Sequence, residues 1–330
     1  MTNTSLKQWI ATSLQNGHQI AKLQDILIKT GFTKEEVEKE LANSVAYLEI
    51  LDKMHAKLFR REALLKTLDY HLRGLPTYLK AEKVKLPPFK QFLEEYYYPN
   101  RFGVFSNVLD NCEAKHWTPA TLLDKVGADT TVQMQYGKGN DVFDMYGKDI
   151  KPIKFGDFIS AMGGAIPAEY LYITANNYDF NHSVFAPLRK EIEDIGDGYF
   201  APEDTDRNKQ AFYIGPKDTV SMLHYDVLDI LLIQVYGRKH IRLIPAMQVP
   251  YMYNNKHPRS CDFGTWGPNL EQYPDFSNVT PIEVEIGPGD ALFIPVGWWH
   301  HITSLSATIS VSCANLKGSN ASHATLTQIL

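Results

Sequence analysis

Cysteine is scarce in this sequence, and long apolar runs are missing from it. Three cysteines occur in 330 residues, far apart along the chain: Cys112, Cys261 and Cys313. This odd, dispersed set argues against a disulfide framework and favours a reducing compartment, with each cysteine a small buried apolar residue. No stretch approaches the ~20 apolar residues of a membrane-spanning helix, and the N-terminus lacks the features of a secretory signal. We therefore expect a cytoplasmic protein without membrane contact.

A strong charge of either sign is also missing. The formal net charge is −5, so nothing in the composition supports a nucleic-acid partner. The chain contains no GxSxG hydrolase motif, no Walker-type loop and no dinucleotide-binding glycine pattern. With 44% hydrophobic and 22% charged residues, the sequence is that of an ordinary globular protein that can bury a full core.

Residues 5 to about 73 have the pattern of helices. The spacing of the apolar residues in "IAKLQDILIK" predicts one buried helix face made of Ile20, Leu23, Ile26 and Leu27. A second helix begins after Thr33, because Thr33 and Glu36 have the spacing of a capping box. Its apolar stripe continues through "EEVEKELANSVAYLEIL", and a further helix, or the same one prolonged, reaches Gly74.

The helical region is expected to be an N-terminal appendage, residues 1–85, followed by the main domain, residues 86–330. The Pro- and Lys-rich stretch "LPTYLKAEKVKLPP" has the composition of a linker between the two. Three roles remain open for the appendage: packing on the main body, a contact in a homodimer, and docking of a substrate.

From about residue 89 the chain changes to short β-rich stretches. Segments such as "FGVFSNV", "DILLIQVYG", "HIRLIP", "PIEVEIG" and "ATISVSCA" are separated by Gly, Pro, Asn and Asp, the pattern of an all-β sandwich or barrel. Helical segments interrupt the pattern, notably "TPATLLDKVG", which opens on Thr118 and Pro119. We predict a mainly β fold with some helix.

One apolar segment, "SMLHYDVLDILLIQVYGRKHIRLIP", carries His224 and Asp226 two positions apart. Alternate side chains on a strand point to the same face, so these two can reach one ion. A metal would offset the cost of placing polar groups in an apolar run. A His-x-Asp pair also occurs by chance at the end of a surface strand, so a third ligand is required.

The segment "IGPGDALFIPVGWWHHITSL" supplies the third ligand. A Gly-Pro-Gly-Asp turn, a short strand and a second break precede two tryptophans and then His300 and His301. Two histidines and one carboxylate leave an open face on a metal, as in non-haem Fe(II) oxygenases. Adjacent residues face opposite ways, so the pattern alone does not choose between the two histidines.

These two segments together resemble the Jumonji-C oxygenases, in particular the cupin-like branch that includes the asparaginyl hydroxylase of hypoxia-inducible factor. The resemblance covers about residues 95–316. It implies a double-stranded β-helix, or jelly roll, that binds Fe(II), 2-oxoglutarate and O2. It also implies that the metal ligands are His224, Asp226 and His300, with His301 turned away.

The resemblance implies a cosubstrate site as well, formed by Lys239, Ser221, Tyr172 and Ser312. Lys239 would pair with the distal carboxylate of 2-oxoglutarate, and alternation along "KHIRLI" places it on the inner face. Tyr170 shares a strand face with Tyr172 and is an alternative to it. Many relatives have asparagine six residues after the first metal histidine, where this chain has Ile230.

The resemblance favours hydroxylation of a protein or peptide side chain. Hydroxylation of a small molecule or free amino acid is the alternative, and a catalytically silent cupin that only binds is a third reading. The long loop "CDFGTWGPNLEQYPDFSNV", rich in glycine, proline and aromatic residues, is expected to form a lip for the substrate around Trp266. Trp298 and Trp299 are expected to be packing residues.

Overall fold

A computed structural model describes residues 3–15, 18–136, 150–164, 171–174, 183–189, 191–192, 198–200, 210–254, 259–264 and 266–317. The chain divides into two compact units, Met1–Leu68 and Asp69–Leu330. This division falls before the linker-like stretch at 75–88, because one helix continues to Arg73 and its last turn belongs to the second unit. No helix among the described residues is both long and apolar enough to cross a bilayer.

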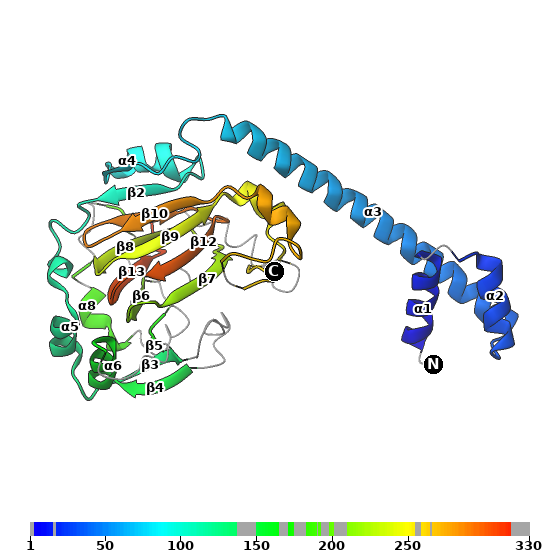
Figure 1. Cartoon of the computed structure of the whole chain (residues 1–330), viewed down its shortest axis with the longest axis horizontal. Coiled ribbons are helices and arrows are strands. Elements are labelled where there is room, and N and C mark those ends of the chain that lie inside the picture. The colour runs from blue at the N-terminus through cyan, green and yellow to red at the C-terminus, as the bar shows by residue number, and fades with distance from the viewer. Residues whose placement is uncertain are drawn as a thin grey trace. The chain divides into compact units, whose positions relative to one another are not determined.

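The first unit is helical. It contains α1 (Asn3–Gln15), α2 (Ile20–Lys29) and most of α3 (Lys34–Arg73) (Figure 1). The predicted capping box is confirmed, since Thr33 N donates to Glu36 Oε2 over 2.9 Å and Glu36 N donates to Thr33 Oγ1 over 3.3 Å. The three helices bury one apolar cluster: Leu6, Ile10, Leu23, Leu27, Val37 and Leu41. The predicted buried face of α2 is wrong in part, because Ile20 and Ile26 are exposed.

The second unit contains two facing sheets. The larger has the strand order β1 (Lys83–Lys85), β2 (Gly103–Ser106), β11 (Ala291–Ile294), β8 (Ile230–Tyr236), β13 (Thr308–Cys313), β6 (Gln210–Gly215). The smaller has the order β10 (Ile282–Ile286), β9 (Lys239–Ile244), β12 (Trp299–Ser304), β7 (Val220–Tyr225) (Figure 1). From β6 to β9, and again from β11 to β13, consecutive strands alternate between the sheets. This alternation makes the jelly roll that the sequence predicts.

Further elements surround this core. A third sheet has the order β4 (Ile150–Lys154), β3 (Thr131–Tyr136), β5 (Leu171–Tyr172). The α-helices are α4 (Phe89–Phe92), α5 (Pro119–Val126), α6 (Phe155–Met162) and α8 (Ala186–Arg189), and a π-helix covers Leu93–Tyr97. The 3-10 helices are Glu113–His116, Ala246–Tyr251 and Pro274–Asn278. The predicted start of α5 is confirmed, because the Thr118 side chain caps the helix and Pro119 is its first residue.

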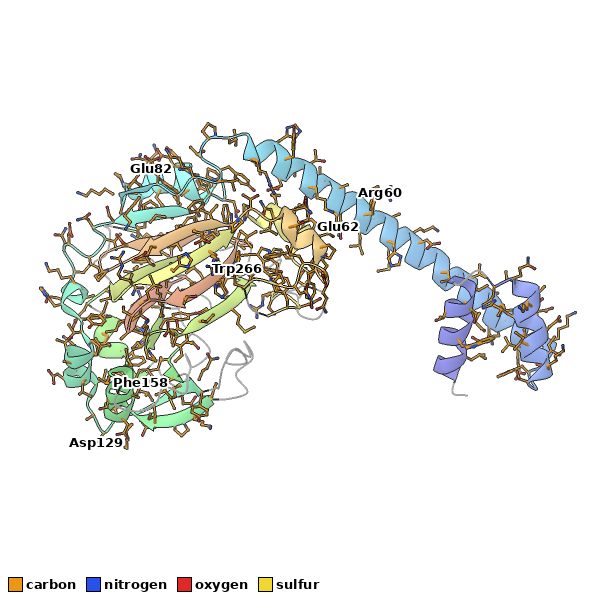
Figure 2. All side chains as sticks on the ribbon, viewed as in Figure 1. Arg60, Glu62, Glu82, Asp129, Phe158 and Trp266 are labelled. Carbon is orange, nitrogen blue, oxygen red and sulfur yellow. The ribbon has the colours of Figure 1, made fainter. Side chains whose placement is uncertain are left out.

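Strand β8 reads as a nearly continuous apolar run because both of its faces are covered. Ile233 on one face belongs to an apolar cluster shared with α5, α6 and α8, of which Phe158 is a member (Figure 2). Leu232 on the other face belongs to the cluster between the two main sheets. The three cysteines are free and buried, as predicted.

Gly237 makes the turn that places β9 after β8. Its φ is +73°, and a Cβ there would overlap the carbonyl of Ala307 and the hydroxyl of Ser306. We expect Gly237→Ala to destabilise the protein by about 2–4 kcal/mol, the sum of backbone strain and overpacking. The measurement is urea unfolding.

Gly267 provides the matched control for that substitution. Its φ is +84°, but nothing lies within 4 Å of the position of its Cβ. Gly267→Ala should therefore cost only the conformational strain, about 1 kcal/mol. Equal losses at the two positions would contradict the close approach that we assign to Gly237.

Candidate metal centre and cosubstrate pocket

His224 lies near the C-terminal end of β7, Asp226 directly follows the strand, and both line the same pocket. Two residues apart on an extended chain, they point to the same side of the strand. The Nδ1–H of His224 donates to the carbonyl of Met222 over 2.6 Å, since a carbonyl oxygen only accepts. The Nε2 atom of His224 is therefore the nitrogen that carries the free lone pair.

Strand β12 brings His300 beside this pair. In the register of β12 with β7, His300 lies opposite His224, and their ring centroids are 4.2 Å apart. The Nε2 of His300 lies 3.5 Å from Oδ2 of Asp226. One ligand atom from each of the three residues lies within 4.8 Å of the others. Side chains from two strands far apart in the sequence thus converge on one point.

The electrostatics of His300 suit a metal ligand. Burial, together with the nearby His224, lowers the pKa of His300 to about 4, although Asp226 opposes the shift. The Nδ1 of His300 lies 3.1 Å from the carbonyl of Trp298, which leaves Nε2 for a ligand role. A neutral imidazole has the free lone pair that a metal needs.

The donor set of the three residues fits a divalent transition metal. Two imidazoles and one carboxylate are a recurring ligand set for such ions, and they leave coordination positions open. His300 is buried, whereas His224 and Asp226 are partly exposed. The accessible side of the group is therefore the side of His224 and Asp226.

His301 faces away from this group. It is 4% exposed but is not among the residues that line the pocket, and its ring lies 6.0 Å from that of Trp266. Burial and the neighbouring Arg242 lower its pKa to about 4. Alternation along β12 accounts for the difference, since His300 points between the sheets and His301 points to the outer face.

Lys239 lies at the other end of the pocket and is 1% exposed. Its Nζ donates to the hydroxyl of Tyr172 over 3.3 Å. Burial lowers the pKa of Lys239 to about 7, and among the described residues no carboxylate forms an ion pair with it. The predicted alternation is confirmed, because Ile241 is buried beside it while His240 turns outward to Glu283. A buried ammonium without an acidic partner is a site for an anion.

Ser221 also lines the pocket, and a β-bulge accounts for this. Ser221 and His224 are three residues apart, so a regular strand would place them on opposite faces. The register of β7 with β12 shifts between His300 and Ile302, so that Ser221 pairs with Ile302 while His224 pairs with His300. The extra residue in β7 returns both side chains to one face. The Ser221 side chain hydrogen-bonds that of Tyr172.

The remaining lining separates into a polar end and an apolar wall. Tyr172 lies at the polar end, as does Tyr213, whose ring lies 5.9 Å from that of Tyr172, and Ser312 also lines the pocket. Tyr170 lies outside the described residues. The wall consists of Ile230, Leu232, Ile294 and Ile302. The position where many relatives have asparagine is thus part of an apolar surface in this chain.

Comparison with known proteins decides the family. The model of the cupin-like domain matches residues 89–313, which include the three converging side chains and Lys239. The chain belongs to this family. The match also covers the strands of the jelly roll from β2 to β13.

Curated relatives of this cupin-like chain have several names. It is 26% identical to "Jumonji C domain-containing protein 5" of Drosophila melanogaster, over 81% of this chain and 67% of that protein. It is 26% identical to "Lysine-specific demethylase JMJ30" of Arabidopsis thaliana, over 71% and 54%. It is 27% identical to "tRNA wybutosine-synthesizing protein 5" of Gallus gallus, over 54% and 57%. The chain thus spans only about half the length of the latter two. The names of these relatives support the resemblance to Jumonji-C proteins. They do not support the narrower resemblance to the asparaginyl hydroxylase, which stays a prediction.

The substrate lip predicted around Trp266 stays a prediction for the cupin-like domain. Trp266 itself does not line the pocket. Its ring lies 5.8 Å from that of Phe276 and 4.9 Å from the guanidinium carbon of Arg242 (Figure 2). The aromatic residues of this loop pack on the outer face of the smaller sheet, over Trp299. Trp298 and Trp299 are buried packing residues, as predicted.

Proposed function

We propose that this protein is an Fe(II)- and 2-oxoglutarate-dependent oxygenase that hydroxylates an unactivated C–H bond of a protein or peptide side chain. The observation that carries the proposal is the meeting of His224, Asp226 and His300 in the pocket that also contains Lys239. A catalytically silent binding module would not need a buried lysine without an acidic partner in the same pocket as three metal ligands.

His224, Asp226 and His300 would hold the ferrous ion, since their donor set is that of the 2-His-1-carboxylate Fe(II) oxygenases. The chemistry that the ion supplies when bound is oxidative: 2-oxoglutarate and O2 give succinate and CO2, with one oxygen atom entering succinate and the other the substrate as hydroxyl. The two imidazoles bind through Nε2, because the Nδ1 atoms face the carbonyls of Met222 and Trp298.

The polar end of the pocket would bind the distal carboxylate of 2-oxoglutarate. Lys239 supplies the charge, and Tyr172 and Ser221 supply hydroxyl groups next to it. An anion stabilises the protonated lysine, so binding of the cosubstrate raises the pKa of Lys239 above its value of about 7. The apolar wall around Ile230 and Leu232 keeps water away from the cosubstrate.

The substrate would approach from the side of His224 and Asp226, which are partly exposed. A polypeptide is the substrate class that we propose, and the relatives named lysine-specific demethylases support it. Removal of an N-methyl group belongs to the same chemistry, since a hydroxylated N-methyl group is an unstable hemiaminal. A small molecule is the alternative, and the relatives named for tRNA wybutosine synthesis add RNA as a class to test.

The test is incubation of the chain with iron, ascorbate and 2-oxoglutarate, first alone and then with panels of peptides, metabolites and tRNA. We expect iron-dependent succinate formation, and a gain of one oxygen atom, or loss of a methyl group, on a peptide by mass spectrometry. Asp226→Ala is the control that should form no succinate. Oxidation of a metabolite or of tRNA alone would replace the proposed substrate class, and absence of succinate under every condition would contradict the oxygenase itself.

A further inference from the structure

The middle of α3 exposes a row of apolar side chains. Met54, Leu58 and Leu68 are 53%, 51% and 40% exposed, and Leu65 is half-buried. Single exposed leucines are common on monomers, but a row along one helix is not. The stability of a helix in a protein comes mostly from packing of an apolar face, and among the side chains that the structure describes, α3 contributes Val37 and Leu41 to the apolar cluster of the first unit.

The spacing of this row is that of a coiled coil. Met54, Leu58, Arg61, Leu65 and Leu68 follow one another at steps of four, three, four and three residues. These are the alternating a and d positions of a seven-residue repeat, which keeps one seam facing a partner helix. Leu58 and Leu65 take the a positions, and Arg61 is the single polar residue of the seam.

The charges beside the seam identify the partner. Lys57 takes a g position and Glu62 the following e position, five residues later. In a parallel pair of identical helices, the g residue of one lies against the following e residue of the other. Lys57 of each copy would therefore form an ion pair with Glu62 of the other copy, which gives two pairs per dimer. Among the described residues neither side chain has an ion-pair partner within its own chain. Lys53 and Arg60 take c positions, away from the seam, where solvent and salt screen their repulsion.

We propose that the partner of this row is a second copy of the same chain, bound through a parallel two-stranded coiled coil of α3. The seam has the spacing of a coiled coil, and the flanking charges are complementary between two copies. A membrane surface or a groove in another protein requires neither the regular repeat nor a pair of opposite charges at a g position and the following e position. The inference is independent of the proposed oxygenase activity.

The test is the mass of the full chain in solution by light scattering and sedimentation equilibrium. We expect twice the chain mass of 37.5 kDa for the natural sequence. Leu58→Lys should raise the dissociation constant at least 100-fold, while far-UV circular dichroism shows that the helices remain. The matched control is Phe59→Lys: Phe59 is 73% exposed, more than Leu58, but lies outside the seam, so the dimer should persist.

Two further variants test the details. Arg61→Leu completes the seam and should tighten the dimer at least tenfold. Lys57→Glu should weaken it, and the charge exchange Lys57→Glu with Glu62→Lys should restore it. A monomeric natural chain, a dimer that survives Leu58→Lys, or failure of the charge exchange to restore association would overturn the proposal. So would a monomer that sediments with anionic vesicles and loses that binding with Leu58→Lys, since the row would then belong to a membrane surface.

Discussion

Alanine at His300 should lower iron-dependent succinate formation by at least about 10³-fold, whereas alanine at His301 should change it only a few-fold. Removing a group that only orients a metal ligand lowers metal affinity or activity about 10–100-fold, so removing a ligand itself should lower activity further. His300 contributes one of the three converging ligand atoms, whereas His301 turns to the outer face beside Trp266. The two substitutions are one residue apart and remove the same side chain, so each controls for the other.

The measurement combines succinate formation with metal content after dialysis. Loss of metal from His300→Ala, with retention in His301→Ala, is the expected pattern. Both rings are buried, so circular dichroism must show that both variants are folded. If folded His301→Ala lost activity and metal while His300→Ala kept them, the metal ligand would be His301, and our assignment of His300 would be contradicted.

Methionine at Lys239 should raise the KM for 2-oxoglutarate at least about 30-fold while leaving the metal bound. Truncating one partner of a buried charge pair costs about 2–5 kcal/mol. Methionine keeps the apolar stem of the side chain and removes the ammonium group, so packing around Tyr172 changes little. Unchanged KM in this variant would move the cosubstrate site elsewhere.

The same variant should be more stable than the natural protein when no cosubstrate is present. Burial lowers the pKa of Lys239 from 10.5 in the unfolded chain to about 7 in the folded protein. Between these values the unfolded chain binds the proton and the folded protein does not, so stability rises with pH in that window. At pH 7 and below, the cost of burying the charge is present in full, on the order of a few kcal/mol.

Urea unfolding of the cosubstrate-free proteins from pH 7 to 10 measures this effect. At pH 7 the free energy of unfolding of Lys239→Met should exceed that of the natural protein, and this difference should shrink as the pH rises. Adding 2-oxoglutarate at about 100 times its dissociation constant should stabilise the natural protein by about 2.7 kcal/mol and the variant by less than about 1 kcal/mol. A natural protein that is more stable than the variant at pH 7 without cosubstrate would show that Lys239 already has an anionic partner.

Strand alternation made much of the site predictable from sequence. It places His224 and Asp226 on one face and turns Lys239 inward, and the structure has these positions. Alternation is a local property of an extended chain, so it needs no knowledge of the neighbouring strands. A sandwich or barrel of short strands was predictable for a related reason, since the sequence shows short apolar segments separated by turn residues, whereas the jelly roll was implied by the family resemblance.

The parts that depend on pairing between distant strands were not predictable from the residues alone. The choice of His300 over His301 depends on the register of β12 with β7, and the residues left it open until the family resemblance was considered. The inward direction of Ser221 depends on a bulge that no local pattern announces. No sequence feature indicated that Tyr213 lines the pocket, because an aromatic residue on a strand is usually a packing residue.

Sequence patterns also could not predict which other segments of the chain cover a given helix face or loop side chain. Ile20 and Ile26 fit the apolar spacing of α2, yet only Leu23 and Leu27 meet the other helices. Trp266 lies in a loop whose length and composition are typical of binding loops, but its ring packs on the outer face of a sheet. Both outcomes are set by tertiary packing, which a one-dimensional pattern does not contain.

The most direct test of the metal centre is a crystal structure of the chain grown with Mn(II) and 2-oxoglutarate without oxygen, with anomalous scattering used to locate the metal. We predict one strong peak bounded by Nε2 of His224, Nε2 of His300 and the carboxylate of Asp226, with the far carboxylate of 2-oxoglutarate at Lys239. A fully occupied metal bound elsewhere, or a pocket that stays free of metal at saturating Mn(II), would contradict the account.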